Sequence, residues 1–166
     1  MSTFTLIHVV LSLVGIGSGF VVLFGLLAGR RLDGWTTLFL ATTLATSATG
    51  YILPAHQLLP SHIVGAISLV VLAFAAYARY PRGLAGGWRR TYVICAALAL
   101  YLNVFVGVVQ AFEKVPALKA LAPTQKEPPF MIAQLVVLVA FFGLAIVASK
   151  RFHEEPVRAI SSRGAA

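Results

Sequence analysis

Long apolar runs separated by short polar turns dominate the chain. Five runs are long enough to cross a hydrocarbon core of about 30 Å, which takes about 20 helical residues. They cover residues 4–29, 35–54, 61–80, 91–112 and 130–149. Proline and glycine in the intervening turns end the helices. The pattern predicts an all-α integral membrane protein with five transmembrane helices in one domain, residues 1–150, followed by a cytoplasmic tail at 151–166.

Two stretches of nearly equal length, 8–35 and 62–88, share one layout. Each begins with a histidine at the head of an apolar helix, reaches a turn that bears arginines and ends on Gly-Trp. Internal repeats of parallel orientation are common in polytopic membrane proteins. The layout therefore predicts two pseudo-repeated hairpins, about 4–54 and 61–112, that form a four-helix bundle with the fifth helix packed against it. A chance likeness between two apolar hairpins is the alternative.

Composition supports a membrane location. The chain is 59% hydrophobic and 11% charged, whereas a soluble domain has about a quarter charged residues. Its net charge of +8 would suit a nucleic-acid partner, but the basic residues lie in short loops between the apolar runs. These charges therefore indicate membrane topology, and nucleic-acid binding is excluded as an interpretation.

Lysine and arginine are unevenly divided between the two sets of loops. One set holds ten of them and the other holds three, Lys114, Lys119 and Lys126. Positive residues in short loops stay cytoplasmic, so the N-terminus is expected outside and the C-terminus inside a bacterial cytoplasmic membrane. The basic rim should attract anionic lipid, at about 1 kcal/mol per residue, or bind a partner in a larger complex. The ten are Arg30, Arg31, Arg79, Arg82, Arg89, Arg90, Lys150, Arg151, Arg158 and Arg163.

Two histidines are the first candidates for chemistry. The predicted spans hold no acidic or basic residue away from their ends, which argues against a transporter that works through a buried carboxylate. His8 and His62 lie at similar depth on nonadjacent helices, the arrangement in which membrane cytochromes hold a haem between two imidazoles. From His8 to Phe112 the chain resembles the small bacterial four-helix cytochromes of the b561-like kind. The resemblance implies haem b bound by His8 and His62 and a role in electron transfer, although such cytochromes carry further histidines within their helices.

Two other ligands fit the polar residues of the same membrane face. His8, His56 and His62 could converge on a metal ion with Glu113 or Glu127, since imidazole suits copper, zinc and iron. Amides offer a second possibility. Gln110 and Gln134, together with His62, would donate hydrogen bonds to the carbonyl oxygens of a quinone.

Interhelical packing is the structural alternative for these amides. Asn103 and Gln110 are seven residues apart and share one helix face. Each hydrogen bond between helices is worth about 0.6 kcal/mol in lipid. The proline-rich segment 113–129, with a short helical turn over 115–121, is expected to lie at the outer surface, where it could cap the bundle or simply connect two helices.

The function that follows is a choice between two classes. Motifs for a nucleophile and its base, a phosphate loop or a zinc site are not found in the sequence, so an enzyme would depend on a cofactor. The first hypothesis is a small redox subunit that binds haem b or quinone in the outer half of the bundle. The alternative is a non-enzymatic accessory or lipid-binding subunit of a larger complex.

Overall fold

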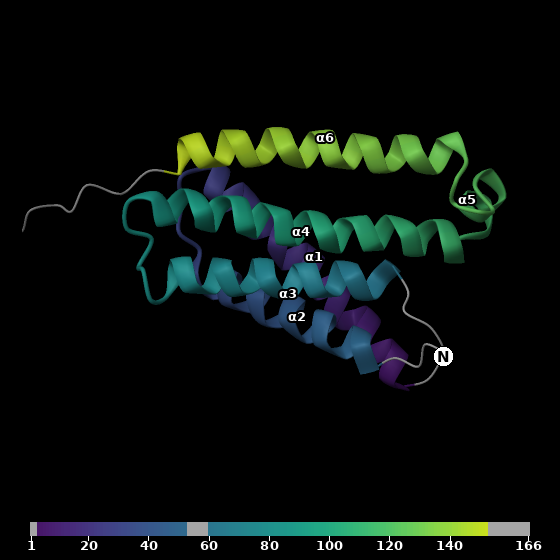
Figure 1. Cartoon of the computed structure of the whole chain (residues 1–166), viewed down its shortest axis with the longest axis horizontal. Helices are drawn as coiled ribbons and strands as arrows, with labels where there is room; N and C mark the ends of the chain where they lie inside the picture. Colours follow the sequence, from purple (N-terminus) through teal and green to yellow (C-terminus); the bar gives the residue numbers. More distant parts are fainter. Residues whose placement is uncertain (1–2, 53–59, 153–166) are drawn as a thin grey trace, which may run out of the picture.

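Six α-helices make up the described part of the chain. The computed structural model describes residues 3–52 and 60–152, and the predicted tail and His56 lie outside them. Every predicted helix is present, and the predicted turn over 115–121 is a short helix (Figure 1). The helices are α1 (Thr3–Leu27), α2 (Asp33–Ile52), α3 (Pro60–Arg79), α4 (Gly87–Lys114), α5 (Pro116–Leu121) and α6 (Pro128–Arg151).

The first four helices close into a ring. Each packs against the next one along the chain, and α1 packs against α4. Helix α6 lies outside this ring against α4 and α1, and α5 packs on α4. The long helices run side by side in alternating directions (Figure 1). The predicted bundle of two hairpins with a further helix packed against it is thus confirmed, while the common origin of the hairpins stays a prediction.

Helix α2 corrects the predicted number of spans. Among the described residues, four helices are long and apolar enough to cross a membrane: α1, residues 62–79 of α3, α4 and α6. Helix α2 is long enough, but seven of its 20 residues are threonine or serine. These hydroxyl groups lower its hydropathy. The prediction of five transmembrane helices is therefore wrong by one, although the helix itself forms.

The middle of the ring is packed tightly around α4. Leu100 and Phe39, each 1% exposed, lie directly on the bare backbone of Gly19 in α1. A Cβ atom at Gly19 would lie 2.5 Å from Leu100 Cδ1 and 2.8 Å from Phe39 Cε2. Helices in lipid associate through such close approaches at small residues, because the surrounding lipid is as apolar as the side chains. Gly19 therefore lets α1, α2 and α4 meet.

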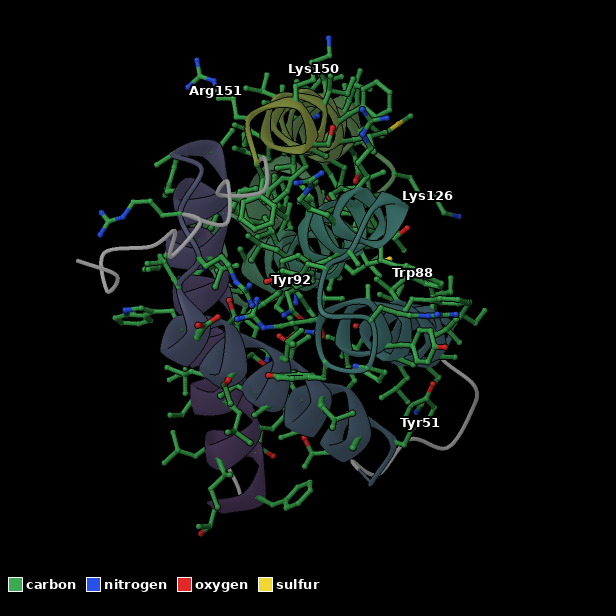
Figure 2. All side chains as sticks on the ribbon, turned by 90° about the vertical axis from the view of Figure 1, so that its left-hand side faces the viewer. Tyr51, Trp88, Tyr92, Lys126, Lys150 and Arg151 are labelled. Carbon is green, nitrogen blue, oxygen red and sulfur yellow. The ribbon has the colours of Figure 1, made fainter. Side chains whose placement is uncertain are left out.

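Eight of the eleven lysines and arginines of the described residues gather at one end of the bundle, which we call the basic end. Arg79 was predicted to belong to an exposed basic rim, but its side chain is only 5% exposed. Its guanidinium donates to Asp33 at the start of α2 and lies 5.3 Å from the Tyr92 ring centre. Figure 2 shows Tyr92 among the helices, whereas Lys150 and Arg151 point outward. The basic end comprises Arg30, Arg31, Arg79, Arg82, Arg89, Arg90, Lys150 and Arg151.

Candidate functional site

A cavity of about 370 Å³ lies within the ring at the end opposite the basic end. All four helices of the ring contribute to its wall. The volume falls in the range of small-molecule sites, about 300–1,000 Å³. Its lining residues are Thr5, His8, Val9, Ser12, Thr46, Ser47, Gly50, Tyr51, His62, Val64, Gly65, Ser68, Leu102, Asn103, Val106, Gly107, Gln110 and Lys114.

The cavity runs inward from the bundle end. Lys114 and Gln110, near the end of α4, are exposed, whereas Ser47, Ser68 and Leu102 are buried. Asn103 stands eleven residues before Lys114, so it lies about 16 Å further in at 1.5 Å per helical residue. We call the inner part, lined by Ser12, Thr46, Ser47, Ser68, Leu102 and Asn103, the floor.

His8 is held in one orientation by α2. Its Nδ1 lies 2.8 Å from Thr49 Oγ1, and that hydroxyl donates its own proton to the Ala45 carbonyl at 2.7 Å. With its proton engaged there, the threonine oxygen accepts from the imidazole, so Nδ1 carries the hydrogen. The Nε2 lone pair of neutral His8 is then available as an acceptor or metal ligand. Such fixing of the tautomer by the other ring nitrogen is typical of functional histidines.

His62 stands on the neighbouring wall, next to Tyr51. The Tyr51 hydroxyl donates to the His62 backbone carbonyl at 2.6 Å, and the two rings are tilted with centres 5.5 Å apart. Gly65 makes room for the tyrosine, because a Cβ atom there would lie 3.3 Å from Tyr51 Cε2. The contact therefore fixes the start of α3 against the end of α2.

The floor is hydrophilic, and most of its polar groups are paired. Asn103 Nδ2 donates to Thr43 Oγ1 at 3.0 Å, and Ser47 Oγ donates to Ser68 Oγ at 3.3 Å. Thr46 is the exception. Its Oγ1 is buried and has no hydrogen-bond partner among the described residues. A buried hydroxyl left unsatisfied costs about 1–3 kcal/mol, so a hydrogen-bond partner for Thr46 Oγ1 would remove this cost.

The structure brings together three of the four residues predicted to bind a cofactor. His8, His62 and Gln110 all line the cavity. Gln134 lies elsewhere, since α6 is outside the ring and its Nε2 donates to the Phe105 carbonyl of α4 at 3.2 Å. That bond matches the structural alternative in which the amide holds two helices together.

The predicted metal set remains incomplete in the described part of the chain. His8 and His62 share the cavity, but His56 lies outside the described residues. Of the two glutamates proposed with them, neither lines the cavity. Within residues 3–52 and 60–152, no three histidine, cysteine or carboxylate side chains gather as metal ligands would.

Glu127 has a structural role at the start of α6. Its carboxylate accepts from the Thr124 hydroxyl at 2.8 Å and from the backbone N–H groups of Thr124 and Lys126. Slight desolvation raises the pKa of Glu127, but these hydrogen bonds outweigh it and bring the pKa below its ordinary value. The segment from α5 to Glu127 supplies no lining residue. It therefore connects α4 to α6 and does not cap the cavity.

Three lining or supporting residues were not predicted from the sequence. Thr46 and Thr49 were not among the predicted site residues, and Lys114 was treated only as a topology signal. The available signal was positional, because residues 42, 46, 49 and 50 fall on one face of α2. Two of these threonines do bond back to their own helix, Thr42 to the Leu38 carbonyl and Thr49 to that of Ala45, as such residues often do in lipid.

The side chains of the cavity wall can bind a ligand through hydrogen bonds. Amide and hydroxyl donors can bind carbonyl oxygens, and the His8 lone pair can accept from a hydroxyl or bind a metal. No family model matches the chain, and no curated protein or solved structure matches it either.

Proposed function

We propose that the protein is a small polytopic membrane protein that binds a quinone-class ligand in the cavity of its helix ring. A quinone presents two carbonyl oxygens on opposite sides of a flat ring, and its reduced form presents two hydroxyl groups. The polar groups of the cavity lie at two depths. Thr46 lies at the floor, and Gln110 and His8 lie nearer the bundle end.

The unpaired hydroxyl of Thr46 is the observation that carries the proposal. Thr46 lines the cavity, and its buried Oγ1 lacks a partner in the described part of the chain. A change of the Thr46 side-chain rotamer would turn this hydroxyl toward a ligand carbonyl, which can accept its proton. At the other side of the ligand ring, the Gln110 amide donates to the second carbonyl. The oriented Nε2 of His8 accepts from the hydroxyl group of the reduced form.

Binding to purified protein tests this proposal. Mass spectrometry of co-purified lipid should detect a quinone, and a short-tailed quinone should bind by calorimetry. Thr46→Val removes the hydroxyl at nearly constant volume and should weaken binding about fivefold, which corresponds to about 1 kcal/mol for one hydrogen bond. Thr37→Val is the matched control, because Thr37 is an exposed residue of the same helix outside the cavity. Wild-type protein that neither carries nor binds a quinone would refute the proposal and favour an accessory or lipid-binding role.

Haem b is the second candidate, and one observation favours it. His8 and His62 line the same cavity, and the contact with Thr49 leaves the His8 Nε2 free for iron. Both imidazoles would hold the group, which would supply one-electron chemistry when bound. A Soret band that shifts on reduction and is lost in His8→Ala is expected in that case. A colourless, folded preparation from haem-replete cells would eliminate this candidate.

For orientation, we propose that the basic end faces the cytoplasm and anionic lipid. The charge asymmetry supports this, because eight of the described lysines and arginines lie at that end and three lie at the other. Labelling of single cysteines would test it, with Cys95→Ser as background. Ala85→Cys should react only from the cytoplasmic side and Ala120→Cys only from the outside, and the reverse pattern would overturn the orientation.

A further inference from the structure

We infer that the ligand of the cavity carries a negative charge, and that Lys114 pairs with it at the bundle end. The inference rests on the proposed function, and it specifies the chemical class of the ligand further. A quinone with an acidic ring hydroxyl fits it, since such a hydroxyl is ionised at neutral pH. Three features of the described cavity wall support it: it holds one lysine, no acidic residue, and several hydrogen-bond donors.

Lys114 is the one residue with a permanently charged side chain among the described lining residues. It has no carboxylate partner in the described part of the chain, where both ion pairs involve Asp33 at the basic end. The neighbouring Glu113 is exposed and lies 3.5 Å from the Gln110 amide through its Oε2. The ammonium group is therefore available to a ligand.

The rest of the described wall adds no negative charge. None of the described lining residues is aspartate or glutamate. Besides Lys114, the ionisable residues of the described wall are His8, His62 and Tyr51, and the exposed Glu113 beside Lys114 does not line the cavity. Amide and hydroxyl donors complete the wall, and they bind an oxyanion as readily as a carbonyl. A neutral ligand would leave the lysine without a counter-charge, whereas an anion would satisfy it together with these donors.

A pair of ring compounds of nearly the same size separates charge from shape. 1,4-Naphthoquinone is neutral, whereas 2-hydroxy-1,4-naphthoquinone is an anion at neutral pH. Calorimetry on the full-length protein in detergent should show that the anion binds about tenfold more tightly, the contribution of one charge-assisted hydrogen bond. The preference should shrink as salt is raised, because the lysine is exposed and its charge is screened.

Variants at Lys114 identify the source of the preference. Lys114→Gln should abolish the tenfold difference while binding of the neutral compound stays unchanged, and Lys114→Arg should retain it. Lys119→Gln is the control, since Lys119 is an exposed lysine of α5 outside the cavity, and it should behave as the wild type. Circular dichroism would confirm that each variant is folded.

The possible failures are distinguishable. Equal binding of the two compounds, or a preference that survives in Lys114→Gln, overturns the charged ligand and leaves the proposed function in place. Binding of neither compound overturns both proposals.

Discussion

Replacement of Gly19 by alanine should destabilise the protein, although alanine is the better helix former. The added Cβ atom would lie 2.5 Å from Leu100 and 2.8 Å from Phe39. Both neighbours are 1% exposed, so neither can move aside without disturbing the packing around it. Overpacking of this kind costs about 1–3 kcal/mol. The gain in helix propensity, about 1 kcal/mol in water, offsets only part of that cost.

Gly17 in the same helix provides the matched comparison. A Cβ atom there would meet nothing within 4 Å, so Gly17→Ala has the propensity gain without the clash. We expect the free energy of unfolding to differ by about 2 kcal/mol between the two variants, with Gly19→Ala the less stable. Titration with SDS in mixed micelles, followed by circular dichroism, measures this difference. Equal stability of the two variants would show that α1, α2 and α4 do not meet at Gly19 as described.

Two further predictions concern charged groups. Asp33→Asn removes the counter-charge of the buried Arg79. Because Asp33 is 71% exposed and screened by water, the free energy of unfolding in the same titration should fall by about 1 kcal/mol. No change would mean that the Tyr92 ring alone satisfies the guanidinium. The pKa of Glu127 is lower in the folded protein than in the unfolded chain, so its hydrogen bonds are fully present above the unfolded pKa and are lost as the pH falls through the folded pKa. The protection of the Thr124 and Lys126 amides, measured relative to the intrinsic exchange rate at each pH, should fall over that acidic range in the wild type, and Glu127→Gln should remove this fall.

The helices could be predicted from the sequence because each apolar run satisfies its own backbone hydrogen bonds in lipid. Their boundaries were accurate to a few residues, and the largest extension occurred where α4 begins at Gly87, within the glycines expected to end a helix. The number of spans was overestimated because length was weighed above polarity in α2. Some of its hydroxyls bond back to carbonyls of α2, as those of Thr42 and Thr49 do, whereas Ser47 and Thr43 bond to other helices.

The site was harder to predict, because depth along a helix does not determine which way a residue faces. His8, His62 and Gln110 were grouped by depth and do share the cavity. Gln134 has similar depth, but its helix lies outside the ring. The role of Thr49 depends on a residue 41 positions away in the sequence, and no local pattern indicates that contact. Buried Arg79 was likewise missed, since an arginine at a helix end usually faces water or headgroups.

The hydroxyl-rich inner face of α2 also bears on how the protein assembles. Its side chains bond to partners on every other helix of the ring: His8 of α1, Ser68 of α3, and Asn103 and Tyr92 of α4. Without those neighbours, α2 is less apolar than the four candidate spans and would enter the hydrocarbon region less readily. Helices that partition into lipid on their own can be inserted one at a time as they leave the ribosome. We therefore expect α2 to insert only together with the helices that bond to it, which would make insertion cooperative at the second helix.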